Sequence, residues 1–273
     1  MDKKKVLIVT QEMDPYTAMN EISNIARKLP EHIQKQGMEI RILMPKYGTI
    51  NERRHRLHEV VRLSGMNIIV DDDDFPLIIK VASIPQARMQ VYFLDNEDFF
   101  KRKMVFDDEN GEPFEDNPDR MIFFCKGVLE TVRKFGWPPD IIHCHGWMTS
   151  LLPLYVKGAY KQEPLFQNAK IVYSLYEQSY DKHFDEDFVE KAAINNLDPE
   201  DLEDYLNNGK VDLHKGALAF SDALIEGNEE LSDSVKAMLE ESGKPVLAHQ
   251  GEEDFKDAYI EFYHSLLEEE VES

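Results

Sequence analysis

"KKVLIVTQEMDPYTAMNEISNIARKLPEHIQKQGMEIRILMP" (4–45) contains one complete structural unit. Its residues 4–9 form a short, continuous apolar run that is typical of a buried strand. Residues 22–33 place apolar side chains at helical spacing, and Gly37 ends the pattern. Residues 39–45 form a second apolar run that ends at a proline. A strand, a helix and a strand within about forty residues indicate a βαβ unit with parallel strands.

The same alternation continues along the chain. Residues 59–100 predict short strands separated by turns, with Asp71–Asp74 as a solvated hairpin tip. Further strands and helices are expected at 117–135 (helix), within 137–147 (a proline turn and a short strand), about 149–157 (helix), 169–177 (strand), 198–206 (helix), 223–227 (last parallel strand) and 232–242 (helix). The pattern predicts an α/β fold, a single Rossmann-like domain with a parallel sheet and a small β-hairpin insertion.

The final residues predict an amphipathic helix after a short linker. Its expected apolar face consists of Phe255, Ala258, Tyr259, Phe262 and Leu266. We therefore expect a domain over residues 1–245 and, over residues 246–273, a linker and a helix that packs back on it.

Charge and composition exclude several function classes. The formal net charge of −22 disfavours phosphate-backbone binding, and the basic stretch "NERRHRLH" (51–58) is interpreted as a solvated face. Two cysteines are too few for a disulfide framework, and no apolar run approaches the length of a membrane span. We expect a cytoplasmic protein with no nucleic-acid partner and no membrane partner.

Three segments carry a family resemblance. They are "MPKYG" (44–48), "EDNPDRMIFFCKGVLETVRKFGWPPDIIHCHGW" (115–147) and "DLHKGALAFSDALIEGNEEL" (212–231). In this order they resemble the N-terminal starch synthase catalytic domain of bacterial glycogen and plant starch synthases. These are GT-B glycosyltransferases that extend α-1,4-glucan from ADP-glucose. The resemblance implies one half of a GT-B fold, here truncated and degenerate.

The first strand-to-helix junction departs from the family pattern, which there reads K-x-G-G-L. Ala18 falls at the lysine, and Asn20 and Glu21 fall at the two glycines. A helix N-terminus attracts anions through its free N–H groups and its dipole. Asn20 is a good N-cap and Glu21 adds a carboxylate to the first turn, so this helix supplies its own anion.

Two further family motifs are altered in the same direction. The motif H-D-W-H becomes His145, Gly146, Trp147 and Met148. The motif T-I-H-N-x-x-Y-Q-G becomes "SLYEQSYDK", with Tyr176 at the histidine, Glu177 at the asparagine, Tyr180 at the tyrosine and Lys182 at the glycine. Because these family positions are altered, we expect no catalytic residue here. The resemblance leaves His145, Trp147, Glu177 and Tyr180 as candidates for binding a glucan or sugar.

Metal and nucleophile chemistry is not indicated by the sequence. His143 and His145 lie on the same side of the predicted strand, but no third ligand is evident nearby. Cys144 alternates to the other face and is interpreted as core. We expect no metal and no cofactor.

In the family, a second domain holds most of the donor nucleotide, and the sequence ends before such a domain could be built. Its final helix resembles the helix that crosses back onto the first domain in GT-B proteins. Three functions remain open: a non-catalytic protein that binds glucan or a partner, a transferase completed by a separate subunit, and a structural or regulatory module that self-associates. For the transferase, Lys182, Lys215 and Arg120 are the candidate cations for a leaving diphosphate.

Overall fold

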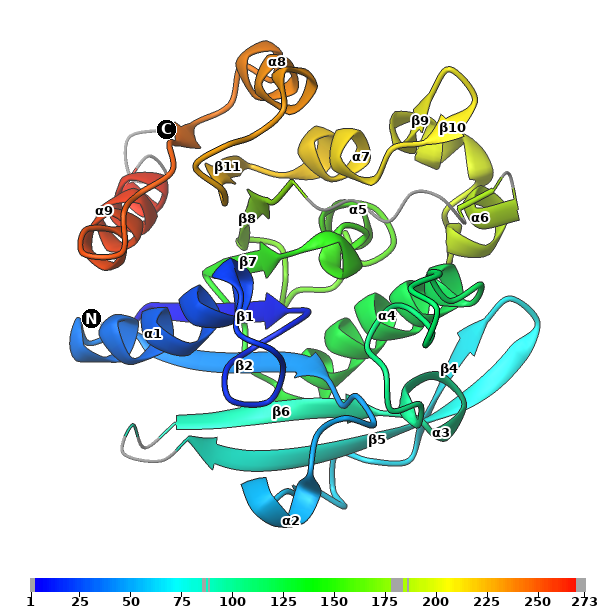
Figure 1. The fold of residues 1–273 in the computed structure, drawn as a ribbon. Helices are drawn as coiled ribbons and strands as arrows, with labels where there is room; N and C mark the ends of the chain where they lie inside the picture. Colours follow the sequence, from blue (N-terminus) through cyan, green and yellow to red (C-terminus); the bar gives the residue numbers. More distant parts are fainter. Residues whose placement is uncertain (1–2, 85–86, 88, 178–183, 186, 269–273) are drawn as a thin grey trace.

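The computed structural model describes residues 3–84, 87, 89–177, 184–185 and 187–268 (Figure 1). Within these residues the fold is built on a ten-stranded sheet with the order β12-β11-β8-β7-β1-β2-β6-β5-β3, and β4 pairs with β5 beside this path. The strands of this sheet are β1 (Lys5–Thr10), β2 (Glu39–Pro45), β3 (His58–Glu59), β4 (Met66–Val70), β5 (Asp73–Ile84), β6 (Met89–Asp95), β7 (Ile141–His145), β8 (Lys170–Leu175), β11 (Ala223–Glu226) and β12 (Val246–Leu247). A separate two-stranded ladder joins β9 (Leu206–Asn207) and β10 (Lys210–Val211).

Helices connect the strands and cover the sheet. They are α1 (Glu21–Lys35), α2 (Glu52–His55), α3 (Glu97–Phe100), α4 (Asn117–Phe135), α5 (Leu152–Lys157), α6 (Asp187–Ala192), α7 (Leu213–Phe220), α8 (Asp233–Glu241) and α9 (Phe255–Glu268), with 3₁₀ turns η1 (Trp147–Thr149) and η3 (Pro199–Tyr205). None of the helices in the described part of the chain is both long and apolar enough to cross a bilayer.

Strand β1 lies at the centre of the sheet. It pairs in parallel with β2 on one side, where Val6 lies opposite Ile40, and with β7 on the other, where Val6 lies opposite Ile141. Residues 6–9 are fully buried, as a continuous apolar run predicts for a strand with both faces covered. The predicted α/β fold with a mainly parallel sheet is confirmed.

The strands between residues 59 and 100 differ in one respect from the predicted insertion. Strand β6 pairs in parallel with β2, with Ile42 opposite Val91, so it belongs to the central sheet. Strand β5 then runs antiparallel to β6 and carries β3 and β4. The hairpin therefore extends the main sheet. Of the predicted tip Asp71–Asp74, only Asp71 and Asp72 form the exposed turn between β4 and β5, whereas Asp73 and Asp74 begin β5 and pair with β4.

Three boundaries also differ from the prediction. Residues 223–227 are not the last parallel strand, because the two-residue strand β12 pairs beyond β11. The predicted helix at 198–206 is the 3₁₀ turn η3, and the one near 149–157 begins as η1 before α5. These segments are short, and at that length tertiary contacts outweigh local propensity.

The C-terminal helix α9 packs beside α1 (Figure 1). Of the predicted apolar face, Phe255, Tyr259 and Leu266 are buried, whereas Ala258 and Phe262 are only partly buried. The helix also buries Ile260, Tyr263 and Leu267, which the prediction omitted. The buried face is wider than a single stripe because the ring of Tyr263 reaches His143 on β7 while other residues of the helix contact α1.

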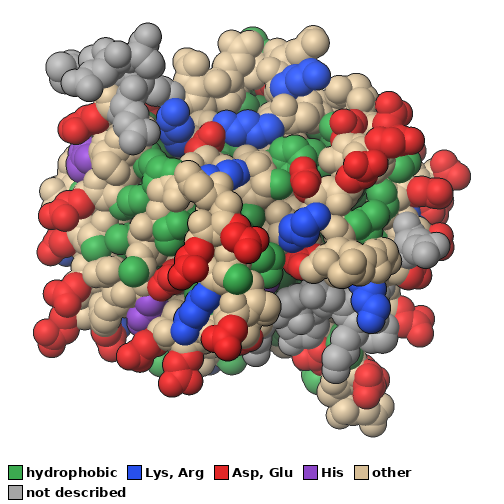
Figure 2. Space-filling model, turned by 90° about the horizontal axis from the view of Figure 1, so that it is seen from above, with side chains coloured by type: hydrophobic (Ala, Val, Ile, Leu, Met, Phe, Trp, Pro, Cys, Tyr) green, Lys and Arg blue, Asp and Glu red, His purple; other side chains and the backbone are tan. Residues whose placement is uncertain are grey.

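The negative net charge is visible on the molecular surface. On the face that carries α7 and α8, Asp and Glu side chains gather around the rim, and only a few Lys and Arg side chains lie among them (Figure 2). Such a surface repels polyanions at long range.

Candidate functional site

The carboxyl ends of β1 and β7 mark the point where the chain changes direction in the sheet, because β1 continues to β2 on one side and β7 continues to β8 on the other. In open α/β sheets, ligands bind in the crevice at such a point. Here the side chain of Gln11 occupies it. Gln11 Oε1 accepts a hydrogen bond from Met148 N at 3.2 Å, and Gln11 N donates to the His145 carbonyl at 3.2 Å.

Gly146 permits this arrangement. Its φ of +88° lies in the region that favours glycine, and a Cβ at this position would lie 2.2 Å from Gln11 Oε1. The position that the resemblance marks as a lost aspartate is thus filled by the side chain of Gln11.

Next to Gln11, Glu12 is a carboxylate that is only 7% exposed. Gln11 Nε2 donates to it at 3.1 Å and Asn20 Nδ2 at 2.9 Å. Burial raises the pKa of Glu12, and these two hydrogen bonds oppose the rise. Sequence reasoning did not identify Gln11 or Glu12. The available signal was a pair of polar residues directly after a buried strand.

Helix α1 begins at this same edge, and its N-terminus is capped by its own residues. Asn20 Oδ1 accepts from Ser23 N at 2.9 Å, and Ser23 Oγ accepts from Asn20 N at 2.8 Å. This reciprocal pair is a capping box, as the predicted N-cap role of Asn20 requires. Ala18 is exposed on the preceding loop.

Glu21 is held by two segments from the far end of the sequence. Asn228, which follows β11, donates through Nδ2 to Glu21 Oε2, and His249 Nε2 lies 2.7 Å from Glu21 Oε1. His249 N also donates to Glu226 Oε2 at 3.2 Å. The segment after β12 therefore lies over the start of α1.

The two histidines of β7 do lie on one side of the strand, with ring centroids 3.8 Å apart. His143 contacts Tyr263 Oη through Nδ1 at 2.5 Å and Ser174 Oγ through Nε2 at 2.7 Å. His145 Nδ1 contacts Tyr176 Oη at 2.9 Å, and its Nε2 has no hydrogen-bond partner in the described chain.

Burial governs the protonation of both rings. It lowers the pKa of His145 to about 3, and it lowers the pKa of His143 well below the usual range, assisted by the neighbouring His145. Both imidazoles are therefore neutral at physiological pH. Among the described residues no group of three or more His, Cys, Asp or Glu side chains is placed to hold a metal ion.

Two of the candidate sugar-binding residues, His145 and Trp147, are not available at the surface. His145 and Trp147 are fully buried, and the Trp147 ring packs edge-on against Phe106 and Phe184. Met148 is also fully buried. In this conformation none of these side chains offers a face to a sugar. Tyr180 and Lys182 lie outside the described residues.

Glu177 is exposed, but its carboxylate has a structural partner. Glu177 Oε2 accepts from Ser232 N at 2.8 Å, where Ser232 is the N-cap of α8. The backbone N of Glu177 donates to Asn228 Oδ1 at 2.7 Å. A carboxylate of this chain thus lies at the start of each helix: Glu21 in the first turn of α1, and Glu177 on the N-cap N–H of α8. Asn228 connects them.

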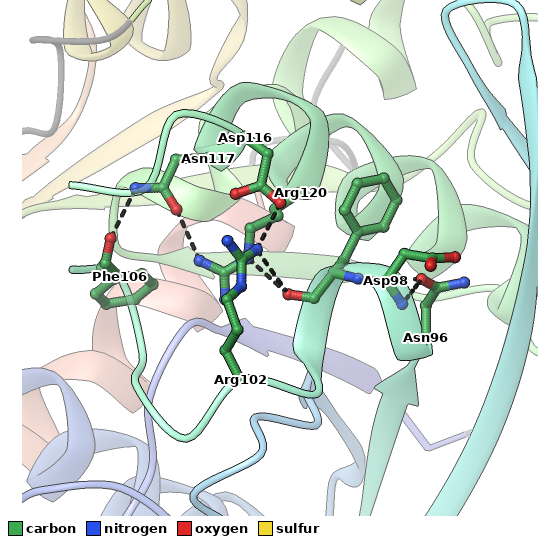
Figure 3. A network of polar contacts seen from close by, with 8 residues as sticks. Asn96, Asp98, Arg102, Phe106, Asp116, Asn117 and Arg120 are labelled. Carbon is green, nitrogen blue, oxygen red and sulfur yellow. Dashed lines mark hydrogen bonds and ion pairs between the residues drawn. The ribbon is translucent and has the colours of Figure 1, made fainter. Parts of the chain in front are cut away.

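The candidate cations are engaged elsewhere. Lys215 Nζ donates to the Leu206 carbonyl at 2.8 Å. Arg120 is fully buried in the network of Figure 3, where Nε donates to the Phe99 carbonyl at 2.9 Å and Nη1 donates to Asn117 Oδ1 at 2.7 Å. Burial lowers the pKa of Arg120 to about 10, so the guanidinium remains charged.

The Arg120 network fixes the loop that precedes α4. Asn117 Nδ2 donates to the Phe106 carbonyl at 3.0 Å, and Arg102 pairs with Asp116 at 2.5 Å (Figure 3). Phe106 in turn packs against Trp147. The network thus fixes the loop before α4 and, through Phe106, supports the Trp147 ring.

Comparisons with known proteins agree with this fold. The starch synthase catalytic domain family matches residues 5–238. The glycogen synthase of Chlorobium limicola is 42% identical over 173 residues, which are 63% of this chain and 35% of that protein. The glycogen synthase of Chlorobaculum tepidum is 39% identical over 200 residues, which are 72% of this chain and 40% of that protein. The chain therefore matches well under half the length of these curated relatives.

The structure is also similar to a solved one. The catalytic domain of starch synthase IV from Arabidopsis thaliana, bound to ADP and acarbose, superposes with a TM-score of 0.72 at 19% identity, over 90% of this chain and 51% of that chain. This likeness concerns the fold. Together with the family match over residues 5–238, it identifies the chain as a member of the starch synthase catalytic domain family, with the Rossmann-like half of a GT-B fold.

Proposed function

We propose that this chain acts in glucan metabolism as a glycogen/starch-synthase-like protein that does not by itself transfer glucose from ADP-glucose. The observation that supports this most is the state of the α1 N-terminus, where Asn20 Oδ1 accepts from Ser23 N and Glu21, held by Asn228 and His249, adds a carboxylate to the first turn. A bound diphosphate would compete with the Asn20 cap for the free N–H groups of this helix and would be repelled by the Glu21 carboxylate.

The departures from the family pattern support the same proposal. Ala18 provides no cation at the position of the family lysine, and Asn20 and Glu21 carry side chains where glycines allow close approach. Lys215 and Arg120 are hydrogen-bonded elsewhere, so neither is free to stabilise a leaving diphosphate.

Calorimetry with ADP-glucose, and incorporation of labelled glucose into glycogen, test the proposal. We expect no binding of ADP-glucose and no incorporation by the purified protein. Incorporation that appears only after addition of cell extract would favour a transferase completed by a separate subunit. Tight ADP-glucose binding by the protein alone would contradict the proposal.

A pair of substitutions on one helix sharpens this test. Glu21→Gln and Glu31→Gln each remove one carboxylate from α1, but only Glu21 lies in its first turn. We expect Glu21→Gln to make weak ADP binding detectable and Glu31→Gln to leave the protein without detectable binding. Equal effects would show that net charge, and not the occupied N-terminus, limits binding.

We further propose that the domain binds glucan or a partner protein. Direct contact of a glucan with His145 or Trp147 would require these buried side chains to become exposed. A titration with maltoheptaose that quenches tryptophan fluorescence in the native protein, and is absent in Trp147→Phe, would support the glucan. Light scattering would detect self-association.

Finally, we propose that residues 1–245 form the family domain and residues 246–273 a linker and a covering helix. The contact of Tyr263 with His143 and the buried face of α9 support this division. A chain shortened after residue 245 should bind a hydrophobic dye and aggregate. A well-folded monomer of that length would contradict the division.

A further inference from the structure

The basic segment 51–58 has no role in the site at the carboxyl ends of β1 and β7. Four arginines in and near it are exposed, namely Arg53, Arg54, Arg56 and Arg62. In the described chain none of them makes an ion pair. Glu52, the nearest acid in sequence to Arg53 and Arg54, is taken by Lys46 at 2.6 Å and Lys80 at 2.8 Å. Glu59 is nearer to Arg56 and Arg62 and is exposed, but it pairs with neither in the described chain. The four arginines therefore make no ion pair in the described chain, although the protein has a net charge of −22.

Two of these arginines line a cavity of about 690 Å³. Its walls include Arg54, His55, Arg56 and His58 from the basic segment and Tyr16 from the loop before α1. The Tyr16 ring packs edge-on against Phe93 of β6 at 4.8 Å and against His55 at 5.0 Å, so this wall is held by aromatic contacts to the sheet and to α2.

The geometry of the segment fixes where the arginines lie. Asn51 caps α2 by accepting from Arg54 N at 2.9 Å, and Arg56 ends the helix with a φ of 54°. A left-handed conformation is costly for a residue with a side chain, and here the N–H of Arg56 bonds to the carbonyls of Glu52 and Arg53. It leaves the basic side chains beside the cavity, with Tyr16 on another of its walls.

We propose that this cavity binds a small soluble ligand that carries a phosphoryl group. The cavity has the volume of a metabolite site, and its cationic wall contains arginine and no lysine. The planar guanidinium matches phosphate oxygens with two parallel hydrogen bonds. A long polyanion is disfavoured, because the protein as a whole carries a net charge of −22. This proposal goes beyond the proposed function and does not depend on it.

Calorimetric titration with inorganic pyrophosphate tests the site. Arg54→Gln together with Arg56→Gln removes two charges from the cavity wall, and we expect the Kd to rise by about tenfold or more. Arg53→Gln together with Arg62→Gln removes two charges that are also exposed but do not line the cavity, and it should change the Kd by less than about threefold. Unchanged melting temperatures would show that both variants are folded.

Several outcomes would overturn the proposal. These are no binding to the native protein, equal losses in the two double variants, and a loss confined to Arg53→Gln with Arg62→Gln. A lipid headgroup presents the same chemistry, so sedimentation with phosphatidylcholine vesicles containing phosphatidylinositol 4-phosphate forms a second arm. Binding to the vesicles without binding of pyrophosphate would overturn the proposal that the ligand is a small soluble molecule. Pyrophosphate binding that responds to Glu21→Gln alone would place the anion at α1, which contradicts this proposal and also weakens the proposed function.

Discussion

The carboxyl edge of the sheet and the basic segment 51–58 both carry charged side chains. The two regions differ in whether these side chains have partners within the chain. At the edge, Glu12, Glu21 and Glu177 each accept hydrogen bonds from the chain itself. In the basic segment, Arg54 and Arg56 have no acidic partner among the described residues. Groups that are satisfied internally stabilise the fold, whereas groups that are left unsatisfied at a concave surface are available to a ligand.

Substitution of Gly146 should disturb the edge most strongly. Gly146→Ala places a Cβ against Gln11 and imposes an unfavourable φ. We expect a loss of about 3 kcal/mol in the free energy of unfolding, measured by urea denaturation. Gly251→Ala is the matched control, because a Cβ there meets nothing within 4 Å, and its effect should stay within about 0.5 kcal/mol. Similar values for both variants would show that Gln11 moves aside without cost.

Acidification should weaken the same edge. His145 has a pKa of about 3 in the folded protein and an ordinary pKa of 6.5 when unfolded, so protons bind the unfolded chain preferentially below pH 6.5. Stability is then complete above pH 6.5 and falls by about 2 kcal/mol between pH 6.5 and 5 from this group alone. His143 acts in the same direction, and the raised pKa of Glu12 opposes it.

Urea denaturation at a series of pH values measures this slope. His145→Gln should flatten it, and replacement of the exposed His264 by Gln should not. A slope that both variants share with the native protein would exclude His145 as its source.

Removing the contact between α9 and β7 should reduce the free energy of unfolding by less than the changes above. Tyr263→Phe removes the hydroxyl that contacts His143 Nδ1 in a fully buried position. We expect a loss of about 1–2 kcal/mol. Tyr92→Phe removes a hydroxyl that bonds Gln90 at an exposed site and should have almost no effect. If Tyr92→Phe proved as costly, the buried contact would have no special importance.

Substitutions in the basic segment should change the free energy of unfolding least. Arg54→Gln with Arg56→Gln removes no ion pair from the described chain, so the free energy of unfolding should change by less than about 0.5 kcal/mol at moderate salt. Chemical denaturation without added anion measures it. A large loss would mean that these arginines serve the fold, and the comparison between the two regions would then fail.

Sequence reasoning identified the fold well where the apolar pattern was long. The strands at 4–9 and 39–45 and the helix between them were predicted, because continuous burial and helical spacing are strong local signals. It failed where pairing partners decide the structure. Strand β6 joins the main sheet because it pairs with the edge of β2 that β1 does not occupy. Strand β12 has only two residues and is too short to show a periodic pattern.

For the candidate site, sequence reasoning predicted individual residues better than their surroundings. The capping role of Asn20 follows from its position before the helix, and the structure confirms it. The partners of Glu21, namely Asn228 and His249, lie more than two hundred residues away in sequence. The burial of Trp147 depends on Phe106 and Phe184, which no local pattern connects to it.

The central place of β1 has a consequence for how the chain is made. Its partner on one side, β2, follows within a few dozen residues, but its partner on the other side, β7, begins only at Ile141. During synthesis on the ribosome, β1 and β2 can pair early while one flank of β1 stays open. An open apolar flank invites pairing with another chain, so the nascent protein should depend on chaperones until residues 141–145 have emerged.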